Sequence, residues 1–302
     1  MYDIIIIGAG TAGLTAGIYA RRSNKKVLIL EANAPGGQII KAANIENYPG
    51  EANISGVDFA NKIYNQTQDL GAEIIFEKAI DIKNYDDHKE VVTKNNTYTS
   101  KALIIATGSE NRKLGLDNEK ELIGKGVSYC ASCDGTFFKG KDVAVIGGGD
   151  TALDDALYLS GVANKVYLIH RNENFRGEIS ELEQIKNKEN VEIITNTNVI
   201  KLNGTNSLES IEVVNKDNNK KIISVSGIFI AVGMIPENEN FSKLIDMDDK
   251  GYIISGEDCH TNIEGIYTAG DNRTKKVRQL VTAASDGANA AIEAIKYVNS
   301  KR

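Results

Sequence analysis

The sequence predicts an α/β fold with two domains, and three observations support this prediction. A β-branched run, a glycine-rich turn, a helical pattern and a second apolar run follow one another twice along the chain. The 302 residues are enough for two domains of ordinary size. The composition, with 28 Gly and 3 Pro, suits a chain that turns tightly between strands and helices.

The first copy of the repeat lies in residues 2–31 and has the pattern GxGxxG. Gly8, Gly10 and Gly13 allow a tight turn and let the backbone approach a pyrophosphate, which the start of the next helix attracts. Glu31 ends the second strand and can accept hydrogen bonds from ribose hydroxyls. This context predicts a dinucleotide site; the alternative is a glycine-rich turn without a ligand.

The second copy has Gly147, Gly149 and Ala152 in the turn, but its second strand ends at a basic residue, Arg171. A cation in place of the acid favours a ribose that carries a 2′-phosphate. Arg176 follows closely and can join it, because arginine binds phosphate in a bidentate way. Two such units predict two nucleotides.

The cysteines predict a redox centre. Cys130 and Cys133 are spaced C-x-x-C, which in redox proteins brackets the start of a helix that lowers the pKa of one thiol. The alternatives are half a zinc site or two unrelated thiols, but no further Cys or His clusters here and we expect no metal. Asp134 can carry a proton, or can be an ordinary acid at a helix start. Cys259 is expected to be a packed thiol.

The remaining segments place the second repeat inside the first domain. Residues 101–108 and 227–233 are apolar strands that each end in glycine, and residues 72–100 and 191–226 alternate in the manner of antiparallel ribbons. A final helix expected at 278–298 is long enough to pack on the first domain. We therefore predict two Rossmann-like three-layer domains, the second inserted into the first.

Charge and hydropathy argue against two kinds of partner. With a formal net charge of −6, an isoelectric point near 5.3 and no basic run, the chain is not expected to bind nucleic acid. The apolar run Ile4–Ile7 is too short for a membrane span or a signal peptide. We expect a cytoplasmic protein that does not bind a membrane.

The chain resembles the low-molecular-weight, bacterial-type thioredoxin reductases over essentially its whole length. The matching segments are Gly8–Gly13, Gly36–Gln38, Glu46–Gly50, Ala106–Gly108, Cys130–Gly135, Gly147–Ala152, Gly270–Asp271 and Arg278–Gln279. A CxxC-Asp-Gly block beside the second nucleotide unit is specific for this branch, since the larger disulfide reductases have their redox pair after the first unit.

The resemblance implies a role for each matching residue. Residues 1–114 and 245–302 would form the FAD-binding domain, and residues 115–244 the NAD(P)H-binding domain with the redox pair. Cys133 would face the flavin, Cys130 would attack the disulfide of the partner, and Asp134 would be the general acid. The implied FAD ligands are Gly8, Gly10, Gly13, Glu31, Gly37, Gln38, Asn47, Asp271, Arg278 and Gln279. The implied NADPH ligands are Gly147, Gly149, Ala152, Arg171 and Arg176.

The implied activity is thioredoxin reduction by a homodimer, with electrons from NADPH. One departure concerns the donor: the family usually has His-Arg-Arg where this chain has His170-Arg171-Asn172. Losing one exposed phosphate contact weakens binding about tenfold. NADH and reduced ferredoxin are therefore alternative donors, although the intact turn Gly147–Ala152 argues against ferredoxin. An oxidase-type or non-catalytic FAD protein is a further alternative, which the CxxC-Asp block disfavours.

Overall fold

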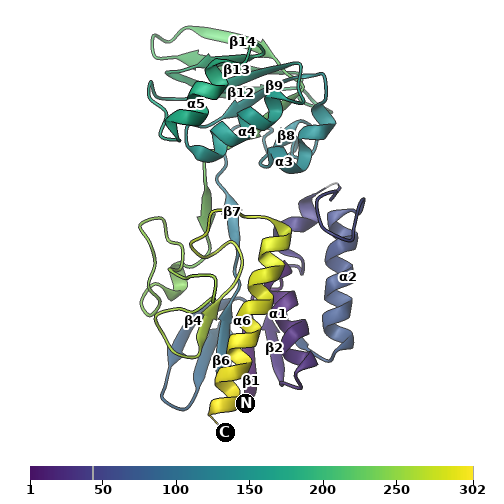
Figure 1. Ribbon diagram of the computed structural model, residues 1–302, viewed down its shortest axis with the longest axis vertical. Coiled ribbons are helices and arrows are strands. Elements are labelled where there is room, and N and C mark those ends of the chain that lie inside the picture. The colour runs from purple at the N-terminus through teal and green to yellow at the C-terminus, as the bar shows by residue number, and fades with distance from the viewer. Residues whose placement is uncertain (43, 302) are drawn as a thin grey trace. The chain divides into compact units, whose positions relative to one another are not determined.

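The chain folds into two compact units, and the computed structural model describes residues 1–42 and 44–301 (Figure 1). The first unit consists of Met1–Glu110 and Ile235–Arg302, and the second of Asn111–Met234. The second unit is inserted into the first, as the order of the two repeats predicted. The predicted boundaries were 114/115 and 244/245.

A mixed sheet of seven strands forms the middle layer of the first unit. Its parallel part has the order β3-β2-β1-β6, with β17 also on β6, and β5 and β4 continue from β6 as antiparallel strands. The strands are β1 Tyr2–Ile7, β2 Val27–Leu30, β3 Glu73–Ile75, β4 Ala79–Asn84, β5 Lys89–Thr93, β6 Thr97–Ile105 and β17 Ile266–Thr268. The four isoleucines of β1 are all buried because a parallel strand is covered on both faces.

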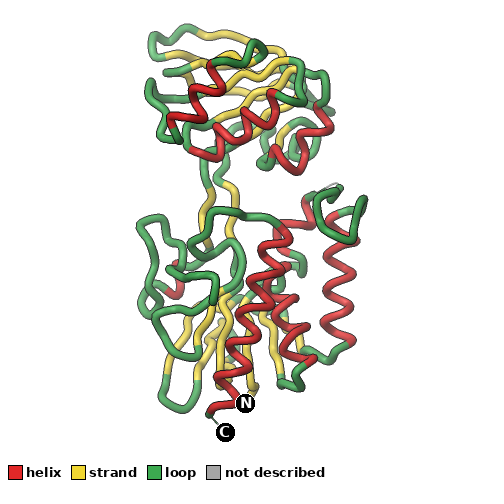
Figure 2. Tube along the Cα trace, viewed as in Figure 1, coloured by secondary structure: helices red, strands yellow, loops and turns green. Residues whose placement is uncertain are grey.

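Helices cover one face of this sheet and loops with the β4–β5 hairpin cover the other. Figure 1 shows α1 (Thr11–Arg22), α2 (Gly56–Asp69) and α6 (Leu280–Ser300) side by side on the helical face. The second face is covered by apolar residues of the β4–β5 hairpin and of the segment that follows η3 (Glu239–Phe241), which is mostly loop (Figure 2). This gives the three predicted layers.

The second unit repeats the arrangement around a parallel sheet of order β11-β10-β9-β15-β8. One face carries α3, α4 and α5, and the other carries the antiparallel sheet β12-β13-β14. The strands are β8 Val127–Ser128, β9 Asp142–Ile146, β10 Lys165–Ile169, β11 Val191–Ile194, β12 Thr197–Asn203, β13 Ser210–Asn215, β14 Lys220–Ser224 and β15 Gly227–Ile230. The helices are α3 Ala131–Asp134, α4 Asp150–Ser160 and α5 Ile179–Lys186.

The prediction of purely antiparallel ribbons at 72–100 and 191–226 was wrong at the start of each segment. There β3 and β11 run parallel to β2 and β10 and extend the main sheets. The partner of each strand is distant in sequence, so alternation within the segment carries no information about its direction. The remaining short elements are β7 Ser109–Asn111, β16 Met234–Pro236, η1 Gly37–Lys41 and η2 Gly135–Phe138. Among the described helices, none has the length and hydropathy that crossing a membrane requires.

Candidate functional site

The redox pair lies in the second unit, at the end of β8. Cys130 and Cys133 form a disulfide with Cα atoms 5.3 Å apart. Cys130 is the extended residue before the short helix α3, and its carbonyl accepts hydrogen bonds from the N–H groups of Cys133 and Asp134 at 3.3 and 3.1 Å. Both cysteines are partly exposed, while Ala131 between them is fully buried against α4. The disulfide is thus fixed on the core and accessible from outside.

Asp134 lies beside this disulfide and is held by a residue that the sequence did not indicate. The Ser128 hydroxyl donates a hydrogen bond to Asp134 Oδ2 at 2.6 Å, and the N–H of Cys130 donates to the Ser128 oxygen at 3.1 Å. Burial raises the pKa of the Asp134 carboxyl, and the Ser128 hydrogen bond partly opposes this rise. Asp134 is therefore a carboxyl that can hold a proton next to the cysteines.

A second carboxyl, Asp155, lies on α4 close to the same turn and was also missed. Burial and the neighbouring charge of Asp154 raise its pKa to about 7, while the backbone N–H of Ala131 acts in the opposite direction. The sequence shows the acidic pair Asp154-Asp155 within the predicted helix. It does not show that Asp155 lies on the face of α4 that packs against the redox turn.

The first glycine turn is closely packed at two positions and open at the third. A Cβ at Gly8 would overlap the carbonyl of Ala106, and a Cβ at Gly13 would overlap the carbonyl of Gly8. At Gly10, by contrast, a Cβ would meet no atom of the described chain within 4 Å. The tight positions let α1 begin directly above β1, and the open position leaves room for a ligand beside the helix start.

Residues distant in sequence contact this turn or one another. Gly37 lies against Gly10, and one Glu31 oxygen accepts a hydrogen bond from the N–H of Ala9 at 2.7 Å. The Asn47 amide donates to the Gln279 side chain at 3.3 Å, although 232 positions separate them. Gln38 is exposed and accepts a hydrogen bond from Lys41.

Asp271 gives the strongest sign of a ligand-binding site. It follows Gly270, which packs on Ala12 in the first turn of α1, and its Oδ1 is buried with no hydrogen-bond partner anywhere in residues 1–42 and 44–301. Burial raises the pKa of this carboxyl, and Lys275 and Arg278 oppose the rise. A buried acceptor without a partner costs about 1–3 kcal/mol, so a donor from a ligand would complete the site. The residues present fit a bound dinucleotide.

A buried ionic cluster fixes the segment that carries Asp271. Asp286 on α6 accepts hydrogen bonds from the N–H of Gly270 at 2.9 Å, from two nitrogens of Arg273 at 2.9 and 2.7 Å, and from Lys275 at 2.9 Å. These hydrogen bonds hold the pKa of Asp286 below its usual range despite its burial. Arg278 lies 4.3 Å above the Tyr252 ring. No pattern in the sequence indicated this cluster.

The second glycine turn is shaped by a histidine. A Cβ at Gly148 would overlap the ring of His170, whose ring centre is 5.0 Å from that of Phe175. His170 is 4% exposed, and its Nε2 has no hydrogen-bond partner within the described residues. The N–H of Arg176 donates to the carbonyl of Gly148 at 2.6 Å.

Both predicted cations lie at this turn. Desolvation lowers the pKa of His170, and the positive charges of Arg176 and Arg171 lower it further, so His170 is neutral at pH 7. Both arginines are exposed, and Gly149 has open space beside it in the described part of the chain. Ala152 is buried at the start of α4. The arrangement can accept an anionic nucleotide.

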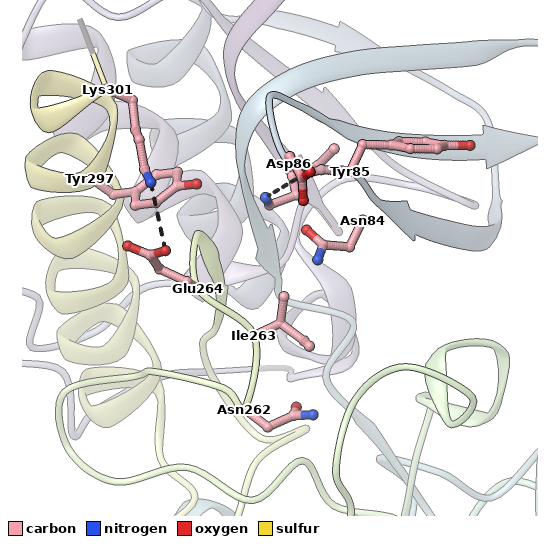
Figure 3. Close-up of a pocket in the computed structure, with 9 residues that line it drawn as sticks. Asn84, Tyr85, Asp86, Asn262, Ile263, Glu264, Tyr297 and Lys301 are labelled. Carbon is pink, nitrogen blue, oxygen red and sulfur yellow. Dashed lines mark hydrogen bonds and ion pairs between the residues drawn. The ribbon is translucent and has the colours of Figure 1, made fainter.

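The cavity drawn in Figure 3 belongs to the first unit and lies away from the first glycine turn. It measures about 400 Å³ and is lined by Tyr297, Lys301 and Glu264, with Lys301 and Glu264 paired at 3.7 Å. Lys89, which lines the cavity, is a strand partner of Ser100, and Tyr2 at the start of β1 is the other strand partner of Ser100. The cavity is therefore near the start of β1, whereas the glycine turn follows the other end of this strand. The described residues contain no cluster of three or more metal-binding side chains.

Comparison with known proteins assigns the chain to a family. The family profile described as pyridine nucleotide-disulphide oxidoreductase matches residues 2–287. Thioredoxin reductase of Listeria innocua is 41% identical over 300 residues, which cover 99% of this chain and 94% of that protein. The enzyme of Bacillus subtilis is 38% identical over 302 residues, covering 99% of this chain and 95% of that one. The crystal structure of thioredoxin reductase from Streptococcus pyogenes is 39% identical, covers 99% of both chains and superposes with a TM-score of 0.93. This chain therefore belongs to the pyridine nucleotide-disulphide oxidoreductase family, among the thioredoxin reductases.

Proposed function

We propose that this protein transfers electrons from NADPH, through FAD and the Cys130–Cys133 disulfide, to thioredoxin. Members of the family use FAD and NADPH. The observation that carries the proposal is a partly exposed CxxC disulfide beside a carboxyl whose pKa is raised by burial, in the unit that also has the second glycine turn. An oxidase-type flavoprotein does not require a redox-active cysteine pair.

The first unit would hold FAD at its first glycine turn. The open side of Gly10 would admit the pyrophosphate, and Glu31, which keeps free lone pairs, would accept from the ribose. The unpartnered Asp271 would accept from a ligand hydroxyl. The other residues proposed to line the site are Gly8, Gly13, Gly37, Gln38, Asn47, Arg278 and Gln279. When bound, FAD accepts a hydride from the nicotinamide and supplies two electrons to the disulfide.

The second unit would bind the nucleotide donor at Gly147, Gly149 and Ala152. Arg171 and Arg176 would bind the 2′-phosphate, because both cations lie around His170 at this turn. NADH would leave these two arginines without a partner. Reduced ferredoxin needs no nucleotide turn at all and stays the alternative donor.

The cysteines would pass the electrons on by thiol–disulfide exchange. After reduction, the Cys130 thiolate attacks one sulfur of the partner disulfide, which forms a mixed disulfide and releases a partner thiolate. Asp134 protonates that thiolate and takes a proton from the Cys133 thiol. The Cys133 thiolate then attacks Cys130, which restores the disulfide and releases the second partner thiolate; this one takes its proton from water.

Rapid mixing tests the donor and the acceptor together. The oxidised protein is mixed anaerobically with NADPH, with NADH and with reduced ferredoxin, and flavin bleaching at 450 nm is followed before thioredoxin is added. We expect NADPH to bleach the flavin fastest and thioredoxin to restore its colour. Bleaching by ferredoxin alone would replace the donor, and a reduced protein that thioredoxin does not reoxidise would contradict the proposed acceptor.

Two further proposals follow from the family alone. We propose that the protein is a homodimer that acts in the cytoplasm. Sedimentation of the purified protein tests the first statement, and fractionation of the producing cell tests the second.

A further inference from the structure

Ser128 connects the Asp134 carboxylate to the backbone of Cys130 through one hydroxyl group. It is 4% exposed at the end of β8, where it pairs with Phe229 of β15. Its Oγ lies 2.6 Å from Asp134 Oδ2 and 3.3 Å from the carbonyl oxygen of Cys130, and it accepts from the Cys130 N–H at 3.1 Å. Both oxygens are acceptors, but a hydroxyl has one proton to donate. The hydroxyl can therefore donate its proton to only one of these two oxygens at a time.

The charge of Asp134 determines which of the two oxygens accepts the Ser128 hydrogen bond. A carboxylate is the stronger acceptor and also the closer one, so ionised Asp134 takes the Ser128 proton. Once protonated, Asp134 can donate its own proton to Oγ, and the Ser128 proton is then free to turn to the Cys130 carbonyl. The hydrogen-bond partner of the Cys130 backbone thus changes with the proton on Asp134.

The groups around Asp134 determine how strongly this hydrogen bond affects its pKa. Its own turn contributes the two cysteines, and α4, which packs on α3, brings Asp155 against the Ala131 N–H and the Tyr158 ring against Gly135. Burial raises the pKa of Asp134, and Ser128 is the one side chain among the described residues with a resolved opposing effect. Removing the Ser128 hydroxyl should therefore leave the effect of burial on the Asp134 pKa unopposed by any of these side chains.

We propose that Ser128 is a positioning residue for proton transfer at the redox disulfide. It stabilises the Asp134 carboxylate left behind after Asp134 has protonated the departing thiolate, and it holds that carboxylate in place until Cys133 supplies the next proton. The inference rests on the proposed function, in which Asp134 is the acid. Neither atoms nor electrons are added to the exchange described above: one proton moves from Asp134 to the partner and one from Cys133 to Asp134.

The test measures the pKa of Asp134 directly, without turnover. Oxidised holoenzyme labelled with ¹³C at the aspartate carboxyl carbons is titrated by NMR, and the Asp134 signal is assigned by its loss in Asp134→Asn. Removing a hydrogen bond to the charged form raises a carboxyl pKa. We expect Ser128→Ala to raise the pKa of Asp134 by about one unit. Ser160→Ala, which removes another partly buried hydroxyl contact of the same unit, should leave it unchanged.

A matched pair covers the case in which the alanine variant does not fold. Ser128→Thr keeps the hydroxyl. Ser128→Val has almost the same side-chain volume as the threonine variant but has a methyl group in place of the hydroxyl. The valine variant should show the raised pKa and the threonine variant the wild-type value. Equal pKa values for Asp134 in wild type, Ser128→Ala and Ser128→Val would overturn the proposal.

Turnover separates this proposal from the proposed function. In Ser128→Ala, the pH above which kcat for thioredoxin falls should move up by about one unit, with KM within twofold of wild type. A kcat lowered equally at every pH would indicate a structural role only and contradict the proposal. Wild-type enzyme that fails to reduce thioredoxin, with the NMR shift present, would refute the acceptor and leave the role of Ser128 standing.

Discussion

At the scale of single residues, two carboxyls with raised pKa values flank the redox turn, and they differ in how they are held. Asp134 has a hydroxyl donor at 2.6 Å, whereas Asp155 is buried beside the charge of Asp154. The sequence predicted Asp134 because it directly follows Cys133. It could not predict Asp155 or Ser128, because their positions relative to the turn depend on how α4 and β8 pack in the second unit.

Asp155 should make the stability of the second unit depend on pH. In the folded protein its pKa is about 7, against about 3.8 when exposed, so folding is penalised progressively as pH rises from about 4 to 7. Asp155→Asn removes this penalty and should stabilise the unit by about 2 kcal/mol more at pH 8 than at pH 5. Thermal unfolding at both pH values measures the difference. Asp154→Asn has the same charge change at an exposed position and removes only the smaller cause of the shift, so it should give a smaller gain. An equal gain in both variants would refute the assignment.

Replacing either cysteine should abolish activity, but the two replacements should differ in their effect on the flavin spectrum. Cys133→Ser and Cys130→Ser should both bind FAD and both lose thioredoxin reduction, because either change removes one sulfur of the disulfide. Only Cys130→Ser leaves a thiolate at position 133, which we expect beside the flavin and which should add a long-wavelength absorption band to the flavin spectrum. Appreciable thioredoxin turnover by either variant, in an assay with wild type as reference, would contradict the role of this pair.

At the scale of elements, the two strand–turn–helix units were predicted correctly because each is specified locally. The β-branched strand, the glycines and the apolar helix face lie within about thirty residues and need no distant partner. The Asp286 cluster was not predicted, since Asp286, Arg273 and Lys275 meet only when the segment before α6 folds back against that helix. The same holds for β3 and β11, whose direction is set by neighbouring strands.

The first glycine turn offers a matched pair of substitutions. Gly13→Ala would push a methyl group into the Gly8 carbonyl and should destabilise the first unit by about 3 kcal/mol or more, even without FAD. Gly10→Ala has a φ of −74° and open space in the described chain, so the apoprotein should fold normally. Its methyl group would occupy the expected pyrophosphate position, and FAD affinity should fall at least tenfold. Unfolding of apoprotein and FAD titration separate the two effects; normal FAD affinity in Gly10→Ala would move the cofactor away from this turn.

At the scale of the whole molecule, the insertion of one unit into the other followed from the order of the repeats and the final helix. The roles proposed for the two nucleotide turns rest on the residue at the end of each second strand, Glu31 in one and Arg171 in the other. These residues specify ligand charge, but ligand affinity depends on the whole cation set. Asn172 is the position at which this set differs from the family pattern.

Asn172→Arg should therefore test the donor. Asn172 is exposed, and its carbonyl accepts a backbone hydrogen bond from Asn196 that a new side chain would not disturb. A third cation beside Arg171 and Arg176 should lower the KM for NADPH up to about tenfold and leave kcat nearly unchanged, because the gain is uniform binding remote from the hydride. The effect should shrink as salt is raised, since exposed charges are screened.

The control is Asn174→Arg, which adds the same charge to the same exposed loop. A smaller gain there would assign the effect to the phosphate position, and an equal gain would reduce it to general attraction of an anion. NADH, which has no 2′-phosphate, should gain little from either variant. If neither nucleotide bleaches the flavin in wild type or in Asn172→Arg, the second glycine turn has kept its fold and lost its ligand. Reduced ferredoxin would then be the donor to test, because the disulfide chemistry of Cys130 and Cys133 does not depend on where the electrons come from.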